Sequence, residues 1–374
     1  MNIAVDIRNL LAPQLTGVGV YTFKILNELM KNDKQNRYFL FYSGIGRNSK
    51  AILDLKKIAP DNFSFCHLKL PNKFLNLCWF LFNRPNLDNF FLKKHNVTID
   101  RWWFPNLNFW FTEKPYILTV HDLSFKIMPQ VYSWKMLIWH HLLGAGKKFR
   151  NAEKLVAVSE NTKRDLITYF KINPDKIKVI PLGVTVLETT PEEIQAVKTK
   201  YNLPEKFFLF LGTREPRKNV EGLLSAYNNL NLEESLVLAG CEGWLGKNLK
   251  KSLKKSPKID KIYIIDYPSD KEKQVLYHLA TAFVWPSFYE GFGLPIIEAF
   301  ACGAPVITSF GSSLPEVTDG TALLIDPYNL NDLERAMIEL SENNLLREQL
   351  REKGLERAKD FSWEKTAEEM LKQF

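Results

Sequence analysis

The chain has 374 residues, which is enough for about two domains, each with a core of its own. Hydrophobic residues make up 45% of the sequence and charged residues 25%, proportions of a globular protein that exclude global disorder. Lys and Arg number 50 against 42 Asp and Glu, and this net charge of +8 suits a nucleic acid, an anionic membrane or a phosphorylated small molecule equally well.

The cysteines and the N-terminus indicate a reduced, cytoplasmic location. The four cysteines lie far apart and form no C-x-x-C pair, so neither a disulfide framework nor a zinc site is indicated. The chain enters a strand-like run at Ile3 without the basic and long apolar segments of a signal peptide. The most apolar stretches, 74–82 and 136–143, are far shorter than the roughly 20 residues of a membrane-spanning helix. We therefore expect a cytoplasmic protein that does not cross the bilayer.

In the first half, short β-branched or aromatic runs alternate with longer helix-periodic segments, which is typical of parallel sheets covered by helices. Strands are predicted at residues 3–6, 38–42, 101–104, 116–120, 155–158 and 178–181. Helices are predicted at residues 20–31, 73–94, 133–150 and 161–170. The polar stretch 184–200 interrupts the alternation and marks a domain boundary.

The second half repeats this scheme without repeating the sequence. Strands are predicted at residues 207–211, 235–239, 261–265, 282–284, 305–308 and 322–325, followed by polar helices from Leu330. The fold class is therefore α/β, with two Rossmann-like domains. Because open parallel sheets bind ligands at the carboxyl ends of their strands, we expect the functional site in a cleft between the two domains.

The loop after the first strand contains Gly17-Val18-Gly19 directly before a helix. Glycines let the backbone approach an anion, and a helix N-terminus offers N–H groups to a phosphate. A plain turn explains this segment equally well. Phe23 stands where the dinucleotide fingerprint requires its third glycine, which disfavours a nicotinamide enzyme.

Two further segments follow predicted strands. His121 and Asp122 follow the strand at 116–120, so their side chains should face the expected cleft, although a histidine with a merely structural hydrogen bond is the alternative. Arg214, Arg217 and Lys218 follow the strand at 207–211 and suit a diphosphate, unless they form a solvated charged turn. Lys218, at the helix start, is the strongest candidate of the three.

The segment 285–307 holds two glutamates, Glu290 and Glu298, separated by seven residues. The first lies in a glycine-rich loop, and the second lies in a helix whose first turn holds Pro295. Carboxylates accept hydrogen bonds from hydroxyl groups, so the pair favours a polyol such as ribose or a hexose. The alternative, a charged helix face, would not require the apolar, glycine-rich surroundings.

These motifs together resemble the retaining family 4 glycosyltransferases with the GT-B fold. The strings at 16–21, 120–122, 158–166 and 212–219 and the E-x7-E string from Glu290 to Glu298 follow in the family's order over nearly the whole chain. The resemblance implies an acceptor-binding Rossmann-like domain at 1–183 and a domain for the nucleotide-sugar donor at 184–358. It also implies a last helix, 359–374, that crosses back to the first domain, and closure on substrate binding.

The resemblance also implies residue roles. Glu298 would bind the ribose, and Glu290 would hold the donor sugar and diphosphate with the backbone of Gly291, Phe292, Gly293 and Leu294. Further donor contacts would come from Gly17, Val18, Gly19 and Ser159, while Lys218 and an arginine would neutralise the departing diphosphate. His121 would contact the transferred sugar, so His121, Glu290 and Lys218 are the expected catalytic residues. Many relatives have an arginine where Thr213 stands, which leaves both Arg214 and Arg217 as candidates for the phosphate contact.

The sequence contains no Asp-x-Asp pair, the usual ligand pair for a metal bound to a diphosphate. We therefore predict transfer without metal or other cofactor, with Lys218, an arginine and helix N-termini stabilising the leaving group. Retention of configuration follows from the resemblance alone. A front-face route is favoured over double displacement, which requires a carboxylate beside the anomeric carbon.

Within the family, the motifs are most similar to mannosyltransferases that build bacterial surface polysaccharide. They imply a hexosyltransferase that acts in O-antigen or lipopolysaccharide synthesis, with GDP-mannose as the favoured donor and a glycan or polyprenyl-linked glycan as acceptor. The alternatives are a UDP-sugar-dependent transferase for glucose, galactose or an N-acetylhexosamine, and a non-catalytic sugar-nucleotide or nucleic-acid binding protein. The cations are scattered and no nucleic-acid reader motif occurs, so we expect no nucleic-acid partner.

Aromatic residues and cations occur together at 73–94 and 134–150. Such mixtures suit peripheral contact with an anionic membrane, which would bring a lipid-linked acceptor to the first domain. Ordinary core faces with snorkelling lysines explain them equally well.

Overall fold

The computed structural model describes residues 1–46, 49–241, 243 and 246–374. These residues form two compact units, a first unit of Met1–Gly183 with Trp363–Phe374 and a second unit of Val184–Ser362. The last helix, α17 (Trp363–Leu371), thus belongs to the first unit. Residues 359–362, predicted to be part of that helix, belong to the second unit.

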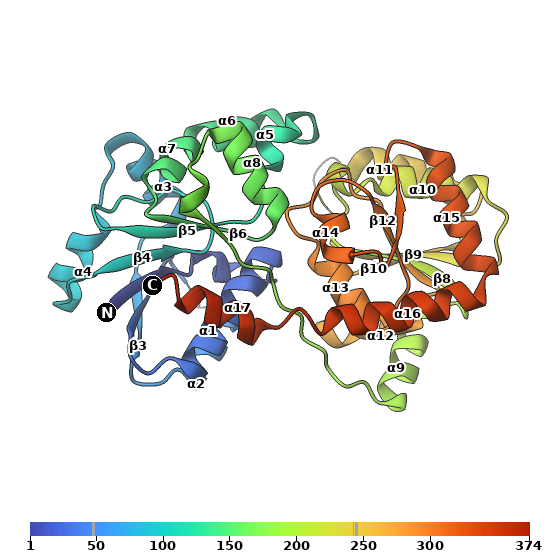
Figure 1. The fold of residues 1–374 in the computed structure, drawn as a ribbon, viewed down its shortest axis with the longest axis horizontal. Coiled ribbons are helices and arrows are strands. Elements are labelled where there is room, and N and C mark those ends of the chain that lie inside the picture. Colours follow the sequence, from blue (N-terminus) through green and yellow to red (C-terminus); the bar gives the residue numbers. More distant parts are fainter. Residues whose placement is uncertain (47–48, 242, 244–245) are drawn as a thin grey trace. The chain divides into compact units, whose positions relative to one another are not determined.

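The sheet of the first unit is entirely parallel among its described strands (Figure 1). Its order is β3 (Phe63–Leu68), β2 (Arg37–Ser43), β1 (Asn2–Asp6), β4 (Arg101–Phe104), β5 (Tyr116–Val120), β6 (Lys154–Ala157) and β7 (Ile177–Val179). The predicted strands of this half are confirmed, with shifted ends. Strand β3 was not predicted, because Ser64 and His67 interrupt its apolar run.

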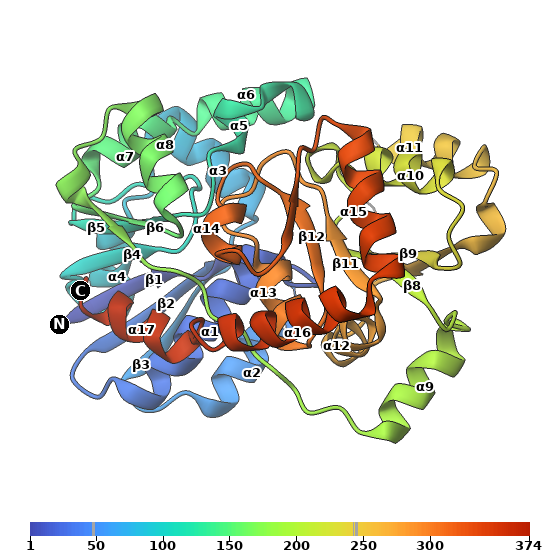
Figure 2. The same cartoon turned by 45° about the vertical axis from the view of Figure 1, so that its right-hand side comes forward.

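Helices cover both faces of this sheet. One face carries α1 (Gly17–Asn32), α2 (Lys50–Ile58) and α17, and α17 lies alongside α1 (Figure 2). The other face carries α3 (Asn72–Phe82), α4 (Leu87–His95), α7 (Ala145–Asn151) and α8 (Glu160–Phe170), which contribute to one apolar core. The remaining elements of this unit are α5 (Ser124–Ile127), α6 (Trp134–Leu142) and the 3-10 turns Arg8–Leu11, Pro129–Val131 and Pro174–Lys176.

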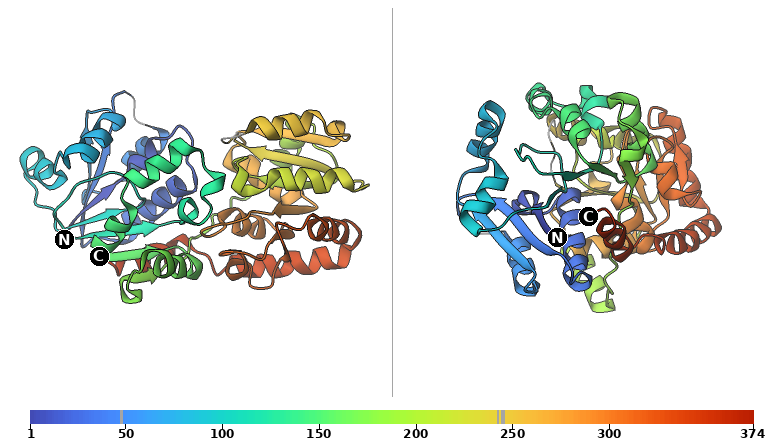
Figure 3. Two further views of the ribbon diagram at one scale, coloured as in Figure 1. Left: turned by 90° about the horizontal axis from the view of Figure 1, so that it is seen from above. Right: turned by 60° about the vertical axis from the view of Figure 1, so that its left-hand side comes forward.

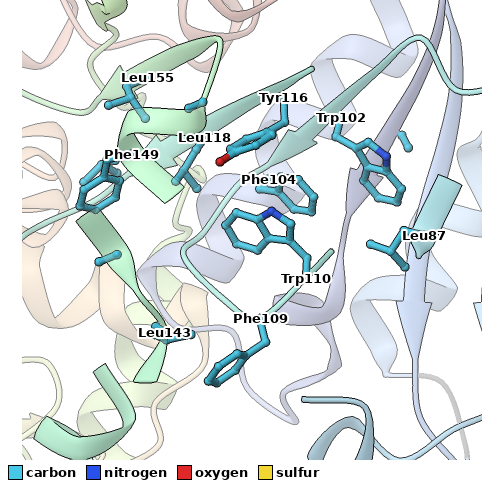
Figure 4. Packing of buried hydrophobic residues seen from close by; sticks show 14 of the residues in the cluster. Leu87, Trp102, Phe104, Phe109, Trp110, Tyr116, Leu118, Leu143, Phe149 and Leu155 are labelled. Carbon is cyan, nitrogen blue, oxygen red and sulfur yellow. The ribbon is translucent and has the colours of Figure 1, made fainter. Parts of the chain in front are cut away.

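Aromatic side chains dominate the core under this second face (Figure 4). Trp102 and Phe104 of β4 stack with ring centroids 5.2 Å apart, and Phe104 stacks on Trp110 at 4.0 Å. Stacked rings of this kind add about 0.5–1.5 kcal/mol per pair beyond their burial. The stacking of Phe104 on Trp110 holds the loop that follows β4. This loop begins with Pro105 at the carboxyl edge of the sheet.

Two predicted long helices are wrong, because each is divided by a residue in the left-handed conformation. The predicted helix at 73–94 is α3 followed by α4, since Asn83 ends α3 with φ 49° and Pro85 cannot continue a helix. The predicted helix at 133–150 is α6 followed by α7, separated at Gly144 with φ 63°. The apolar periodicity of the sequence continues across both breaks. A prediction from periodicity therefore joins each pair of helices into one.

The second unit has a parallel sheet among its described strands in the order β10 (Ile262–Asp266), β9 (Ser235–Gly240), β8 (Phe207–Leu211), β11 (Ala282–Trp285), β12 (Val306–Ser309) and β13 (Leu323–Ile325). One face carries α10 (Val220–Asn229), α11 (Gly246–Lys254) and α15 (Leu330–Glu342). The other carries α12 (Asp270–Leu279), α13 (Leu294–Ala301) and α16 (Asn344–Ala358) (Figure 3). The remaining elements are α9 (Pro191–Tyr201), α14 (Leu314–Thr318) and the 3-10 turns Pro216–Lys218 and Ile259–Lys261.

Helix α9 occupies most of the polar stretch 184–200, for which only a domain boundary was predicted. Its start carries a capping box between Thr190 and Glu193, with Pro191 in the first turn. This is a recognised start signal for a helix, so the sequence did contain the information. None of the helices within the described residues combines the length and the apolar character needed to cross a bilayer.

Candidate functional site

Close backbone packing shapes the carboxyl edge of the second sheet. A Cβ atom on Gly212, directly after β8, would lie 2.6 Å from the ring of Trp285 at the end of β11. Gly240 ends β9 with φ 122°, and a Cβ atom there would collide with the backbone of Gly212. Glycine thus lets the loops after neighbouring strands come together at this edge.

Glu290 is the centre of a buried ionic network at this edge. Its Oε1 accepts hydrogen bonds from Lys218 Nζ at 2.5 Å, Trp285 Nε1 at 3.0 Å and Ser287 Oγ at 2.6 Å. Its Oε2 accepts a hydrogen bond from Arg217 Nη1 at 2.9 Å. The ammonium group of Lys218 also lies 4.7 Å from the centre of the Trp285 ring. The structure therefore brings together Lys218, Arg217 and Glu290, three residues that the motifs single out.

Burial opposes the charged forms in this network: together with the charge of Arg217 it lowers the pKa of Lys218, and it raises the pKa of Glu215. Burial alone would raise the pKa of Glu290, but the charges of Lys218 and Arg217 and the hydrogen bonds from Lys218 and Ser287 lower it to about 2. A second carboxylate, Glu215, pairs with Arg217 at 2.8 Å. The interpretation of the 212–219 segment as a solvated charged turn is wrong, because the Arg214, Arg217 and Lys218 side chains are each at most 12% exposed.

The two candidate arginines have different partners. Arg217 donates to the backbone carbonyl of Tyr289 at 2.8 Å as well as to Glu290, so it lies in the same network as Lys218. Arg214 donates to Asp266 at the end of β10 at 2.5 Å, and it reaches the carbonyl of Gly240 at 3.4 Å. The structure thus places Arg217 next to Lys218 and ties Arg214 to the neighbouring strands.

The loop from Gly291 to Leu294 is held by serines that follow β12. Ser312 Oγ accepts a hydrogen bond from the backbone N–H of Glu290 at 2.9 Å, and Ser313 Oγ donates to the carbonyls of Glu290 and Phe292 at 3.0 and 2.8 Å. The Phe292 ring packs on Phe361 with centroids 5.8 Å apart. These contacts fix the course of the loop, and the donor contact that the family resemblance implies for its backbone stays a prediction.

Glu298 lies on α13, whose first turn holds Pro295 as predicted, and its side chain is half-buried. Its Oε2 accepts a hydrogen bond from the Tyr277 hydroxyl of α12 at 3.2 Å. Burial and the neighbouring Glu298 raise the pKa of Tyr277 well above its ordinary value, so the phenol remains a donor at neutral pH. Tyr277 thus orients the carboxylate.

At the carboxyl edge of the first sheet, Gly17, Val18 and Gly19 form the first turn of α1. A Cβ atom on Gly19 would lie 3.0 Å from the Leu15 side chain, so packing favours glycine there. A Cβ atom on Gly17 would meet no described atom within 4 Å. The space beside Gly17 and the N–H groups of this first turn match the geometry expected for a phosphate contact.

His121 follows β5, as predicted. A hydrogen bond at one of its ring nitrogens indicates which tautomer it adopts. Its Nε2 lies 2.8 Å from the carbonyl oxygen of Pro105, and since a carbonyl only accepts, Nε2 carries the proton. Burial lowers the pKa of His121, opposed by the Pro105 hydrogen bond and by Asp122. The ring is therefore neutral at pH 7 with Nδ1 as an acceptor.

Ser159 is the N-cap of α8. Its hydroxyl is fully buried, accepts a hydrogen bond from the Thr162 N–H at 3.0 Å and lies 3.1 Å from Thr162 Oγ1. A cap of this kind stabilises a helix by about 1 kcal/mol. The contact gives Ser159 a structural function, while its part in donor binding stays a prediction.

Several contributors were missed in the sequence. Trp285 and Ser287 lie inside the segment that was singled out, so their proximity to Glu290 was the available signal. Tyr277 lies on another helix and belongs to no motif. Pro105 contributes only a backbone carbonyl, which carries no side-chain signal.

Comparisons with known proteins cover both units. A family model described as "Glycosyltransferase Family 4" matches residues 15–186, and one described as "Glycosyl transferases group 1" matches residues 191–357. The "O-antigen chain mannosyltransferase B" of Escherichia coli is 34% identical over 255 residues, which cover 66% of this chain and 67% of that protein. The "Serotype-specific mannosyltransferase WbdA" of Escherichia coli is 31% identical over 230 residues, 59% of this chain but only 28% of that protein.

A solved structure shows the same fold. HepE of Anabaena, in complex with UDP and glucose, superimposes with a TM-score of 0.77 at 15% sequence identity, over 100% of this chain and 99% of that one. At this identity the similarity concerns the fold.

Proposed function

Because this chain belongs to the group 1 glycosyltransferases of family 4 and has their GT-B fold, we propose that it transfers a mannosyl residue from GDP-mannose to a glycan of bacterial surface polysaccharide. Sequence similarity to two Escherichia coli mannosyltransferases, one of them an O-antigen chain enzyme, supports the sugar and the kind of product. The structural observation that carries the proposal is the buried pairing of Lys218 and Arg217 with Glu290 at the carboxyl edge of the second sheet.

In this proposal, the second unit holds the donor. Lys218 and Arg217 neutralise the diphosphate, and Glu298, oriented by Tyr277, accepts hydrogen bonds from the ribose hydroxyls. The partners of the two arginines favour Arg217 over Arg214 for the phosphate contact. The backbone between Gly291 and Leu294 supplies N–H groups to the donor. Gly17, Val18, Gly19 and Ser159 of the first unit stay predicted donor contacts, as the family resemblance implies.

His121 contacts the transferred sugar. As a neutral ring whose Nε2 proton is engaged by Pro105, it offers Nδ1 to a sugar hydroxyl. In that state it adds no positive charge beside the oxocarbenium-like sugar of the transition state. His121 therefore orients the sugar rather than protonating the leaving group.

We propose transfer with retention and without a metal ion. The two cations in the second unit stabilise the leaving diphosphate electrostatically, and such fixed charges can replace a metal. Glu290 is engaged by four donors, so it is poorly suited to attack the anomeric carbon. This supports the front-face route, in which the leaving phosphate takes the acceptor proton. A trapped glycosyl-enzyme adduct would refute it.

The acceptor, a glycan or polyprenyl-linked glycan, binds the first unit, which contacts an anionic membrane peripherally. Exposed apolar side chains follow one face of α3 with Phe74, Leu77 and Leu81, and Phe80 and Phe82 adjoin them.

Helix α6 has a similar exposed apolar face, formed by Trp134, Ile138 and Leu142. The ring of Phe109 lies between the two helices, with its centroid 6.3 Å from that of Phe80 and 6.0 Å from that of Trp139. Exposed Lys73 and Lys135 flank these faces, which favours anionic lipids. Lys148, by contrast, packs over Trp110 at 3.8 Å and belongs to the core.

The donor is tested by a thermal-shift screen of purified protein with GDP, UDP, ADP and their sugar conjugates, each with and without EDTA. Ligands that bind only the native state raise its apparent stability, by about 2.7 kcal/mol at a hundredfold excess over Kd. We expect stabilisation by GDP and GDP-mannose, unaffected by EDTA and lost in Glu298→Ala but kept in the exposed control Glu221→Ala. A shift that requires metal, or no shift with any nucleotide, would contradict the proposal.

Two further measurements test the product and the membrane contact. NMR of the product should show the anomeric configuration of the donor. Flotation with phosphatidylglycerol vesicles should recover the protein, and phosphatidylcholine vesicles should not. Phe82→Ser should weaken flotation, whereas Phe310→Ser, which changes another well-exposed aromatic in the second unit, should not. Equal flotation of both variants would argue against contact through α3.

A UDP-sugar donor is the second candidate. The observation that favours it is the fold similarity to HepE, which was solved with UDP and glucose. The thermal-shift screen separates the two, because a preference for UDP over GDP would select this alternative.

A further inference from the structure

The imidazole of His121 is held by contacts from two other elements. Its Nε2–H donates to the Pro105 carbonyl after β4 at 2.8 Å, which fixes one edge of the ring. A single hydrogen bond leaves the ring able to pivot about it. The second contact is the ring of Tyr21 on α1, which meets the imidazole at 87° with centroids 4.8 Å apart. This edge-to-face contact defines the plane of the imidazole.

Tyr21 is itself fixed in place. It is fully buried, and its hydroxyl lies 3.2 Å from Thr119 Oγ1. Thr119 precedes His121 by two residues on β5 and also accepts a hydrogen bond from the Trp103 indole at 3.1 Å. The Tyr21 ring is thus tied to β5, the strand that directly precedes His121.

The last helix of the chain supports Tyr21 from a further side. Trp363, the first residue of α17, lies with its ring centroid 6.5 Å from that of Tyr21 at 63°. Helix α17 is anchored to the first unit by Thr366 Oγ1, which donates to the Pro181 carbonyl at 2.9 Å, and by Lys154, which donates to the Gln373 carbonyl at 3.1 Å. The position of Trp363 is therefore set by contacts at both ends of the helix.

We propose that Tyr21 is a positioning residue for His121 and that Trp363, carried by the returning helix α17, holds Tyr21 in place. Tyr21 sets the plane of the imidazole, so Nδ1 points in one direction at the carboxyl edge of the first sheet. This inference rests on the proposed role of His121 toward the transferred sugar. It gives α17 a function in the site and not only in the packing of the first unit.

The experiment combines NMR of ¹⁵N-labelled histidine without donor and steady-state kinetics of Tyr21→Phe, Tyr21→Leu and Trp363→Leu. Tyr21→Phe keeps the ring, so the His121 tautomer and pKa should be unchanged and kcat should stay within about twofold. Tyr21→Leu removes the ring but keeps the Pro105 hydrogen bond, so the His121 pKa should rise toward about 6.5 and the ring signals of His121 should shift and broaden as the imidazole pivots. Its kcat should fall about 10- to 100-fold with little change in the KM for the donor. Trp363→Leu should produce the same changes at smaller amplitude.

Tyr38→Leu is the matched control. Tyr38 is equally buried, its hydroxyl donates to Asp33 at 2.5 Å, its ring stacks on Phe63 at 4.4 Å, and it also contacts the end of the chain through Phe374 at 6.1 Å. It should lose as much thermal stability as Tyr21→Leu while keeping kcat and the His121 signals of the wild type.

Unchanged His121 signals in Tyr21→Leu, or equal changes in Tyr38→Leu, would overturn the positioning role. Unchanged signals in Trp363→Leu would overturn the supporting role of α17. If Tyr21→Leu shifts the His121 signals while His121→Ala keeps wild-type kcat, the positioning role stands and the proposed role of His121 in transfer fails.

Discussion

The carboxyl edges of the two sheets hold their functional side chains by different physical means. In the second unit, Glu290 joins Lys218 and Arg217 through hydrogen bonds of 2.5 and 2.9 Å between opposite charges. In the first unit, His121 is held by the ring of Tyr21 and one backbone carbonyl, and its own ring is neutral. An ionic network depends on a complete set of charges, because each buried charge needs its partner. An aromatic contact depends on shape and tolerates an isosteric change of the polar group.

The largest effect is expected where a charge is removed from the network, and Glu290→Gln does this while keeping the shape of the side chain. Lys218 then loses its paired carboxylate and Arg217 keeps only Glu215, and breaking a buried pair typically costs about 3–5 kcal/mol of unfolding free energy. We expect a loss of this size in urea denaturation. Loss of the orientation of Lys218 should also lower kcat by about 10²- to 10³-fold.

Glu233→Gln is the control for this substitution. Glu233 pairs with Lys206 at 2.6 Å, but the two side chains are 75% and 55% exposed. Exposed pairs of this kind contribute less than about 1 kcal/mol. Similar stability losses in the two variants would contradict the assignment of Glu290 as the centre of a buried network.

A smaller effect is expected from Gly212→Ala, which disturbs the network through shape and leaves every charge in place. The added Cβ would lie 2.6 Å from the Trp285 ring, so the indole must move, and with it the hydrogen bond to Glu290 at 3.0 Å. Overpacking of this kind costs about 1–3 kcal/mol. Urea denaturation should show this loss, and calorimetry should show weaker donor binding.

Gly17→Ala is the control for this substitution. No described atom lies within 4 Å of the added Cβ there, so stability should stay nearly unchanged. Equal losses in both variants would contradict the importance of the Trp285 contact.

Much of the fold was predictable because buried parallel strands are continuous apolar runs, as Phe207–Leu211 illustrates. Strand β3 was not, since Ser64 and His67 break its run. The helix boundaries at Asn83 and Gly144 were not predicted either, and the reason is related. A single left-handed residue ends a helix, yet it changes the hydrophobic periodicity of its surroundings very little.

The candidate site was predictable only where its residues form local motifs. Lys218 and Glu290 were each found in their own string, but their hydrogen bond joins positions 72 residues apart and comes from the pairing of β8 with β11. The contact between Tyr21 and His121 likewise depends on the packing of α1 against the sheet. Motifs identified the groups, whereas the partners that orient them required the tertiary structure.

The smallest effect, a dependence of stability on pH, separates the two regions by their chemistry. Burial lowers the pKa of His121, His140 and His95, all of the first unit, so below about pH 6.5 the unfolded chain binds more protons than the folded one. Acid should therefore weaken the first unit as the pH falls below this value. The lowered pKa of Glu290 affects stability at a lower pH, because its stabilising contribution is lost only between about pH 4.3, the usual pKa of glutamate, and pH 2.

Amide hydrogen exchange, corrected for intrinsic rates and read separately on peptides of each unit, should show the first unit losing protection between pH 7 and 5 while the second retains it. His140→Asn should reduce this loss, and equal loss in both units would contradict the assignment to buried histidines.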